Sequence, residues 1–196
     1  MVQSRVKTFL IFAFSIVFAV FFSFLICWFV ADLNYARGTA LLVDGYYLRA
    51  EESLFRSVLL WPREPAYLRT LARLYAHLAS SSRAADLAVT DGHSLLAAAQ
   101  TYAEKAYQVN PRNFITTKSL IYTYYLLSKQ NEAFQLRTEQ LISRGESLCP
   151  TDPSVPYLAA VIYRDWEMSE KSATFAERAL HLKPDFTQAA ELQVSD

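Results

Sequence analysis

The sequence predicts an all-α protein in which a single transmembrane helix is followed by a right-handed α-solenoid of about four helical hairpins. Two observations carry this prediction. The first is an unbroken run of 24 uncharged residues near the N-terminus, residues 8–31. The second is a short pattern ending in proline that returns four times in the rest of the 196-residue chain. No segment has the pattern of a convincing β-strand.

The composition divides the chain between two kinds of surroundings. Eight of the 13 Phe residues lie between residues 9 and 29, whereas all 12 Tyr residues and every acidic residue lie from residue 32 onward. Phe has no polar tip and suits hydrocarbon, while Tyr suits a core whose edges meet water. The formal net charge is zero, and no basic run marks a nucleic-acid footprint, so we expect no nucleic-acid partner.

The uncharged run is long enough to cross a lipid bilayer, because a helix needs about 20 apolar residues to span the hydrocarbon. Sixteen of its residues are Leu, Ile, Phe or Val, and on an insertion scale they contribute about −5 to −10 kcal/mol. We therefore predict a short N-terminal flank over residues 1–7, a transmembrane helix over 8–31 and a repeat domain over 32–196. The lipid bilayer is then one partner of the chain.

The alternative is a cleaved secretory signal. The apolar run is longer than the 7–15 residues of a typical signal core, and Phe29 stands where a small residue is needed before a cleavage site. An uncleaved, single-pass anchor is favoured. Arg5 and Lys7 on the N-terminal side favour a cytoplasmic N-terminus and an extracytoplasmic repeat domain.

Small residues recur every fourth position along one face of the predicted transmembrane helix. Such a stripe lets a second helix approach closely in the membrane, although small residues are common in membrane helices and chance explains the stripe equally well. Its members are Ser15, Ala19, Ser23, Cys27 and Ala31.

The repeated pattern is read backwards from four prolines. Each has a small residue five positions before it and an apolar residue two positions before it. The prolines are Pro62, Pro111, Pro150 and Pro184, and the small residues are Ser57, Ala106, Gly145 and Ala179. A helix of this kind packs its apolar stripe on the preceding helix, and the proline ends it. We expect helices near 33–44, 47–61, 65–79, 94–109, 114–128, 131–147, 154–166 and 169–182.

The spacing resembles that of the tetratricopeptide repeat. Pro150 and Pro184 are 34 residues apart, the length of that repeat. The other spacings, of 49 and 39 residues, imply added residues, of which about 15 fall around "SSSRAADLAVTDGHS". The expected units are approximately 31–64, 65–113, 114–152 and 153–186, with a short closing helix over 186–193.

Repeat-packing residues follow from aligning these units. They are the small or apolar residues at which the two helices of a hairpin cross, together with the residues of the first turn. The set is Gly38, Gly45, Tyr47, Ala50, Leu71, Ala72, Tyr75, Ala103, Ala106, Ala160, Tyr163, Ala176 and Ala179.

A second resemblance covers nearly the whole chain. An apolar helix ending in "WFVADLNYARG" leads into "WPREPAYLRTLARLYAHLA", "YAEKAYQVNPRN", "LCPTDPSVPYLAAVIY" and "ERALHLKPDF". This order resembles the C-terminal part, the last membrane helix plus repeats, of O-antigen ligase or polymerase-like membrane proteins. The resemblance implies a role in extracytoplasmic glycan transfer in the cell envelope. The catalytic loops of that family lie between earlier membrane helices, so no functional residue carries over.

The chain shows no pattern that predicts catalysis, a cofactor or a metal site. His77, His93 and His181 are isolated, and Glu51 and Glu52 are neighbours on a solvated face. Tyr122, Tyr124 and Tyr125 fit either a core or a ligand groove, and their helical spacing favours the core.

The predicted function is that of a membrane-anchored, non-catalytic scaffold for protein–protein interaction. Its partners would be proteins, with a polytopic membrane protein among the candidates. The alternative is an accessory or truncated C-terminal portion of an O-antigen ligase or polymerase-type glycan-transfer system. An anchored assembly factor for pili or secretion is a third interpretation.

Overall fold

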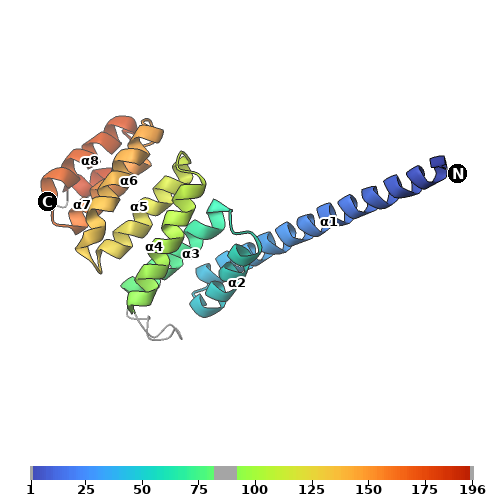
Figure 1. Ribbon diagram of the computed structural model, residues 1–196. Coiled ribbons are helices and arrows are strands. Elements are labelled where there is room, and N and C mark those ends of the chain that lie inside the picture. The colour runs from blue at the N-terminus through green and yellow to red at the C-terminus, as the bar shows by residue number, and fades with distance from the viewer. Residues whose placement is uncertain (1, 82–91, 195–196) are drawn as a thin grey trace. The chain divides into compact units, whose positions relative to one another are not determined.

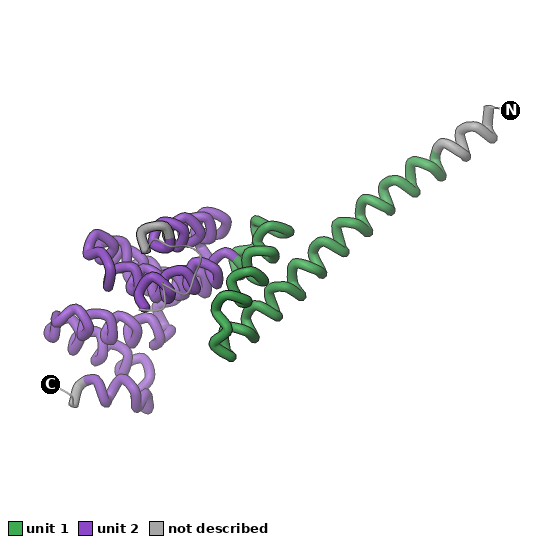
Figure 2. The backbone as a smooth tube through the Cα atoms, turned by 90° about the horizontal axis from the view of Figure 1, so that it is seen from below, with its two compact units in different colours: residues 1–67 green, residues 68–196 purple. Residues whose placement is uncertain are grey.

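The computed structural model describes residues 2–81 and 92–194, and within these residues all regular structure is helical. The predicted all-α fold class is confirmed. Contacts group the chain into two compact units, residues 1–67 and 68–196, which Figure 2 shows in different colours. The predicted boundary after residue 31 falls inside a continuous helix. This boundary therefore marks an expected passage from lipid to water along one helix, and it stays a prediction.

The first unit is built on α1 (Val2–Val43), a single helix of 42 residues that Figure 1 shows as an uninterrupted rod. No Pro or Gly separates Ala31 from Arg37, so the apolar segment and the first helix of the repeats form one helix. The second helix, α2 (Tyr47–Leu60), packs along its C-terminal part. Gly38 makes this approach possible, because a Cβ atom there would lie 2.7 Å from Cγ of Leu54.

Two hairpins share the same turn geometry, and in both the chain passes through the left-handed region after the first helix. Gly45 has φ +78° after α1, and Glu167 has φ 59° at the equivalent place after α7 (Ser154–Asp165). Each turn is closed by a pair of backbone bonds that satisfies the last carbonyls of the helix. In each pair, the bond that spans five residues joins Tyr46 N to Leu41 O or Met168 N to Tyr163 O, at 2.9 Å in both cases.

The second unit contains the rest of the array. Its elements are most of α3 (Pro65–Ser80), α4 (Gly92–Val109), α5 (Phe114–Ser128), the 3₁₀ turn η2 (Glu132–Phe134), α6 (Gln135–Leu148), α7, α8 (Ser169–Leu182) and α9 (Thr187–Val194). Apart from the helix predicted over 131–147, the helices predicted from residue 47 onward are confirmed to within two residues, and the one predicted over 33–44 is the last part of α1. The added residues that the sequence places around 80–94 lie largely outside the described residues.

One predicted helix start was wrong. The sequence predicted a helix from residue 131, whereas α6 begins at Gln135 after the 3₁₀ turn. The reason is local, since the Asn131 side chain accepts a hydrogen bond from the amide of Ala133 at 2.9 Å. That bond favours a tight turn over an α-helical start.

The helix ends explain the proline pattern. Before three of the four prolines, Pro62, Pro150 and Pro184, the preceding residue donates its backbone N–H to the carbonyl of the small residue four positions earlier, and this bond closes the helix. The pairs are Trp61 to Ser57 at 3.0 Å, Cys149 to Gly145 at 3.1 Å and Lys183 to Ala179 at 2.9 Å. The proline that follows has no N–H with which to continue the ladder.

The next helices begin at side-chain caps. Asn113, two residues after Pro111, accepts a hydrogen bond from the amide of Thr116 at 2.9 Å. Asp152, two residues after Pro150, accepts one from the amide of Ser154 at 2.8 Å. These bonds satisfy amides that have no partner within their own helix. Proline and cap together set the length of the connections in the array.

Candidate partner-binding surface

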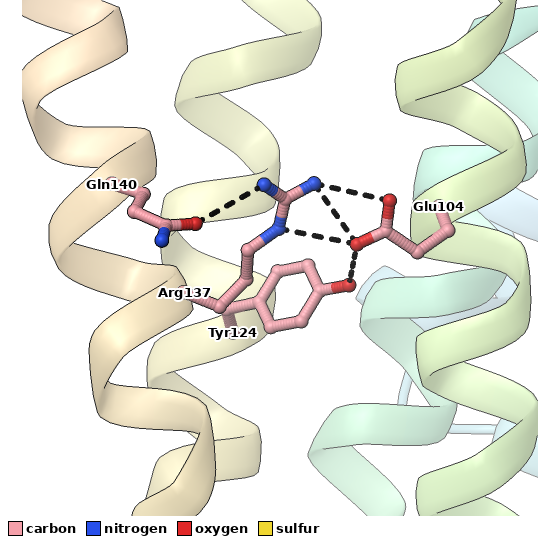
Figure 3. A network of polar contacts seen from close by, with 4 residues as sticks. All are labelled: Glu104, Tyr124, Arg137 and Gln140. Atoms are coloured by element: carbon pink, nitrogen blue, oxygen red, sulfur yellow. Dashed lines mark hydrogen bonds and ion pairs between the residues drawn. The ribbon is translucent and has the colours of Figure 1, made fainter.

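A polar network joins three successive helices of the second unit, as Figure 3 shows. Glu104 of α4 accepts a hydrogen bond from the hydroxyl of Tyr124 on α5 at 2.5 Å. The same carboxylate accepts two bonds from the Arg137 guanidinium of α6, Nε to Oε1 at 3.1 Å and Nη2 to Oε2 at 3.0 Å. Arg137 also donates to Gln140 at 3.4 Å. The bidentate geometry fixes both the distance and the rotation between helices.

A second set repeats this arrangement one hairpin later. Glu139 of α6 accepts hydrogen bonds from the Tyr163 hydroxyl on α7 at 3.1 Å and from Lys171 of α8 at 3.0 Å. The Lys171 ammonium lies 4.8 Å from the centre of the Tyr163 ring. Burial, and then the Glu139 carboxylate, raise the pKa of Tyr163 to about 12. The phenol therefore stays protonated at neutral pH and donates to Glu139.

The two sets follow a sequence register beyond the one that small residues and prolines define. Tyr124 and Tyr163 each lie 13 positions after a proline of the pattern, and Arg137 and Lys171 each lie 13 positions before the next one. Tyr75 holds the same place after Pro62, and its ring stacks on Tyr102 with centroids 5.9 Å apart. Sequence reasoning missed this signal, which was present as an aromatic–basic pair in fixed register with the prolines.

A third link joins α5 directly to α7. The Tyr125 hydroxyl donates to Asp165 Oδ2 at 3.0 Å, and the Lys129 ammonium lies 3.1 Å from the same oxygen. Trp166 Nε1 donates to the Ser128 hydroxyl at 3.3 Å. These contacts, with the two networks above, link the helices from α4 to α8 through polar side chains.

The first helices of the hairpins bury one face and expose another. Residues that lie 6, 9, 10 and 13 positions after Pro62, Pro111 and Pro150 are all buried, in α3, α5 and α7 respectively. The first of these twelve residues is Leu68 and the last is Tyr163. On the other side, at 4, 7 and 11 positions, α3 and α5 present exposed or half-buried residues. Ala66 is the first of these six residues, and we call the other five the first-helix face: Arg69, Arg73, Ile115, Lys118 and Tyr122. The equivalent α7 residues, Tyr157 and Val161, are partly covered by packing that includes Phe186 and Leu192.

The first-helix face carries positive charge without compensation on its own helices. Neither α3 nor α5 contains an acidic residue, whereas α4, α6 and α8 together contain five acidic and five basic residues. Asp152 is an acidic group close to Lys118 of this face. Burial opposes its ionisation, but hydrogen bonds from Ser154 and the charge of Lys118 hold its pKa below the ordinary value. Ile115 and Tyr122, 62% and 40% exposed, add apolar area between the cations.

A cavity of about 380 Å³ lies between the turn that follows α5 and the turn that follows α7. Its lining includes Lys129, Glu132, Asp165, Trp166 and Glu167. Lys129 is already paired with Asp165, so the remaining charges in this lining are the carboxylates of Glu132 and Glu167.

Among residues 2–81 and 92–194, no three His, Cys, Asp or Glu side chains gather as metal ligands would. His77 and His181 are exposed, and the side chain of His93 lies outside the described residues. Glu52 forms an ion pair with Arg56 at 2.6 Å, next to the partly buried Glu51.

The predicted membrane stripe divides into two parts. Ser15, Ala19, Ser23 and Cys27 are exposed along α1, whereas Ala31 is fully buried within the first unit. The hydroxyls of Ser15 and Ser23 donate to carbonyls of their own helix, at 2.9 and 2.8 Å. Both hydroxyls in the exposed part of the stripe are therefore satisfied within α1.

Most of the predicted repeat-packing residues lie in the core. Fully or almost fully buried are Gly38, Ala50, Leu71, Ala72, Tyr75, Ala103, Ala106, Ala160, Tyr163, Ala176 and Ala179. Gly45 is exposed in its turn, and Tyr47 is half-buried. Of the three clustered tyrosines, Tyr124 and Tyr125 are buried and Tyr122 is on the first-helix face.

Comparison with solved structures defines the fold. The chain superposes on TTC0263, a thermophilic tetratricopeptide-repeat (TPR) protein of Thermus thermophilus, with a TM-score of 0.67 at 20% identity, over 84% of this chain and 80% of that chain. YrrB, a TPR protein with an unusual peptide-binding site, gives 0.59 at 15% identity over 84% and 74%. The MamA protein gives 0.58 at 13% identity over 84% and 79%. The chain therefore has the fold of a TPR array.

No family model matches the chain, and no curated protein matches it. The resemblance to O-antigen ligase or polymerase-like proteins thus rests on the sequence motifs alone.

Proposed function

We propose that the protein is a membrane-anchored TPR scaffold that binds an acidic, extended segment of a partner protein on its first-helix face. The TPR fold supports the scaffold part, because such arrays present long surfaces for other proteins. The peptide-binding site named for YrrB supports an extended ligand. The observation that carries the proposal is the charge imbalance between the first helices, α3 and α5, and the second helices of the hairpins.

The anchor in this proposal is α1. Its stretch Leu10–Val43 is long and apolar enough to cross a membrane, and none of its most apolar part is buried. Eight exposed Phe and Ile side chains between Ile11 and Phe24 would otherwise face water. A signal sequence would meet the same test of length and composition, so retention of α1 in the mature chain is part of the proposal. Anchoring would raise the local concentration of the scaffold beside its partner.

The first-helix face supports an acidic partner for a physical reason. Arg69, Arg73 and Lys118 are not balanced by acids on their own helices, so an approaching carboxylate gains attraction without displacing an ion pair within those helices. Ile115 and Tyr122 offer apolar contact beside these cations. Charges of this kind contribute to the rate and specificity of association more than to its strength.

The glycan-transfer alternative would use the same chain differently. The exposed stripe of Ser15, Ala19, Ser23 and Cys27 would then dock on a polytopic membrane protein. Replacing Ala19 and Ser23 with leucine would remove such a partner while leaving the first-helix face intact.

Reversing two charges tests the acidic-segment proposal. We expect the double variant Arg73→Glu, Lys118→Glu to lose a protein partner that the wild-type chain retains during affinity purification from detergent-solubilised native membranes. At low ionic strength we expect the affinity to fall about tenfold, which corresponds to about 1.4 kcal/mol of binding free energy. Circular dichroism establishes that the variant is folded.

The matched control is Lys105→Glu, which reverses an exposed cation on α4, outside the first-helix face. This variant should retain the partner. Recovery of the same proteins with all three chains would contradict the proposal.

A further inference from the structure

The end of α2 turns toward the membrane-facing part of α1. Leu54 of α2 lies against Gly38 of α1, whereas the Trp61 ring meets the Phe24 ring edge-on, with centroids 4.5 Å apart. The chain then turns back, since the Tyr67 hydroxyl donates to Asp32 at 3.3 Å. The Trp61–Pro62 elbow therefore approaches α1 at a point nearer its N-terminus than the residues on either side do.

The level of this elbow follows from helix geometry. Twenty residues counted from Thr8, where the uncharged run begins, reach Cys27 and span about 30 Å of hydrocarbon. Phe24 lies three residues inside that limit, or about 5 Å. With the hydrocarbon spanning Thr8 to Cys27, the boundary between hydrocarbon and headgroups lies at the level of the Trp61–Pro62 elbow.

The side chains around the elbow suit such a boundary. Leu59 is 71% exposed and Leu60 is 36% exposed, beside the exposed apolar surface of α1. Arg63 follows the apolar end directly and is followed by Glu64, whereas Arg56, one turn earlier, is paired with Glu52. Tryptophan concentrates where lipid meets water, because its ring is apolar and its N–H is polar. Arginine reaches lipid phosphates from such a position.

We infer that the elbow of the first repeat, formed by Leu59, Leu60 and Trp61, is seated in the interface of the lipid bilayer. The first hairpin is thus a second, shallow membrane contact beside the transmembrane helix. This inference rests on the proposed membrane insertion of α1. It goes beyond that proposal, because insertion of α1 does not by itself require α2 to touch the lipid. Two contacts at different depths would fix the tilt of α1 and so the presentation of the first unit.

Depth-dependent fluorescence quenching tests the inference. The variant Trp28→Phe, Trp166→Phe keeps Trp61 as the sole tryptophan. We expect its emission, in vesicles of phosphatidylcholine and phosphatidylglycerol, to be quenched strongly by lipids brominated near the headgroup and weakly by lipids brominated near the chain ends. Non-brominated vesicles give the reference emission.

A second reporter separates the two claims. Replacing all three tryptophans with phenylalanine and adding Phe14→Trp places a single tryptophan at an exposed position inside the apolar part of α1. Its emission should be quenched most by the deep bromines. Quenching at Phe14→Trp without quenching at Trp61 would overturn the inference and leave the anchor standing. No quenching at either position would overturn the proposed anchoring, and the inference with it.

Discussion

Replacing Gly38 with alanine is expected to destabilise the α1–α2 hairpin by about 1–3 kcal/mol, the usual cost of overfilling a packed contact. The new Cβ would lie 2.7 Å from Leu54 Cγ, 2.9 Å from Leu54 Cδ2 and 3.2 Å from the Leu54 backbone nitrogen. The backbone contact leaves little room for relief by a change of rotamer. Urea unfolding in detergent, followed by the emission of Trp61 in a chain without Trp28 and Trp166, reports on this unit.

A double-mutant cycle tells this steric cost from a general loss of helix stability. Leu54→Ala alone removes a fully buried side chain and should cost about 2–5 kcal/mol. In that background, Gly38→Ala should cost clearly less than in the wild type, because the contacts with Leu54 Cγ and Cδ2 are gone, only the 3.2 Å contact with the backbone nitrogen remains, and alanine favours the helix. An equal cost for Gly38→Ala in both backgrounds would contradict the close approach of α2 at Gly38.

Removing the Glu104 carboxylate is expected to cost the second unit about 2 kcal/mol, from within the range for leaving buried donors without an acceptor. Glu104→Ala deprives both the Tyr124 hydroxyl and the Arg137 guanidinium of their shared acceptor. Tyr124 is only 1% exposed, so its hydroxyl has little access to replacement water. Arg137 is 30% exposed at its side chain and recovers part of its hydration, which limits the loss.

Two comparisons identify the source of that loss. Glu177→Ala on α8 removes an exposed carboxylate and should change the free energy of unfolding by less than about 0.5 kcal/mol. In a Tyr124→Phe background, Glu104→Ala should cost about 1 kcal/mol less than in the wild type, because one of the two orphaned donors is absent. Full additivity of the two substitutions would argue against the shared acceptor.

The helices were predictable from the sequence because their signals are local. The prolines remove the N–H that would continue each helix, the residues before Pro62, Pro150 and Pro184 close their helices, and Asn113 and Asp152 open the helices that follow them. The start of α6 was not predictable by the same means. A single side-chain bond from Asn131 replaced the first helical turn with a 3₁₀ turn.

The polar networks were harder to predict, since their members are far apart in the chain. Glu104 and Arg137 are separated by 33 positions, and only the stacking of hairpins brings them together. A lone charged residue has no visible partner in the sequence. The usable signal was the distance of 13 positions from a proline that the tyrosines share and that the basic residues share. The same limit applies to Tyr122 and Tyr125. Helical spacing predicted that Tyr122 and Tyr125 share one face of the helix and belong to the core. Their rings do lie 6.0 Å apart, but only Tyr125 is buried, since Tyr122 is 40% exposed.

Alkaline carbonate fractionation of cell membranes tests the central claim most directly. A full-length chain with a C-terminal tag is extracted with carbonate, and the mass of the recovered protein is measured. A helix embedded in lipid resists this treatment, so we predict recovery in the membrane pellet at the mass of the intact 22.3 kDa chain plus the tag. Release into the supernatant, or a mature chain shortened by the apolar segment, would contradict the account.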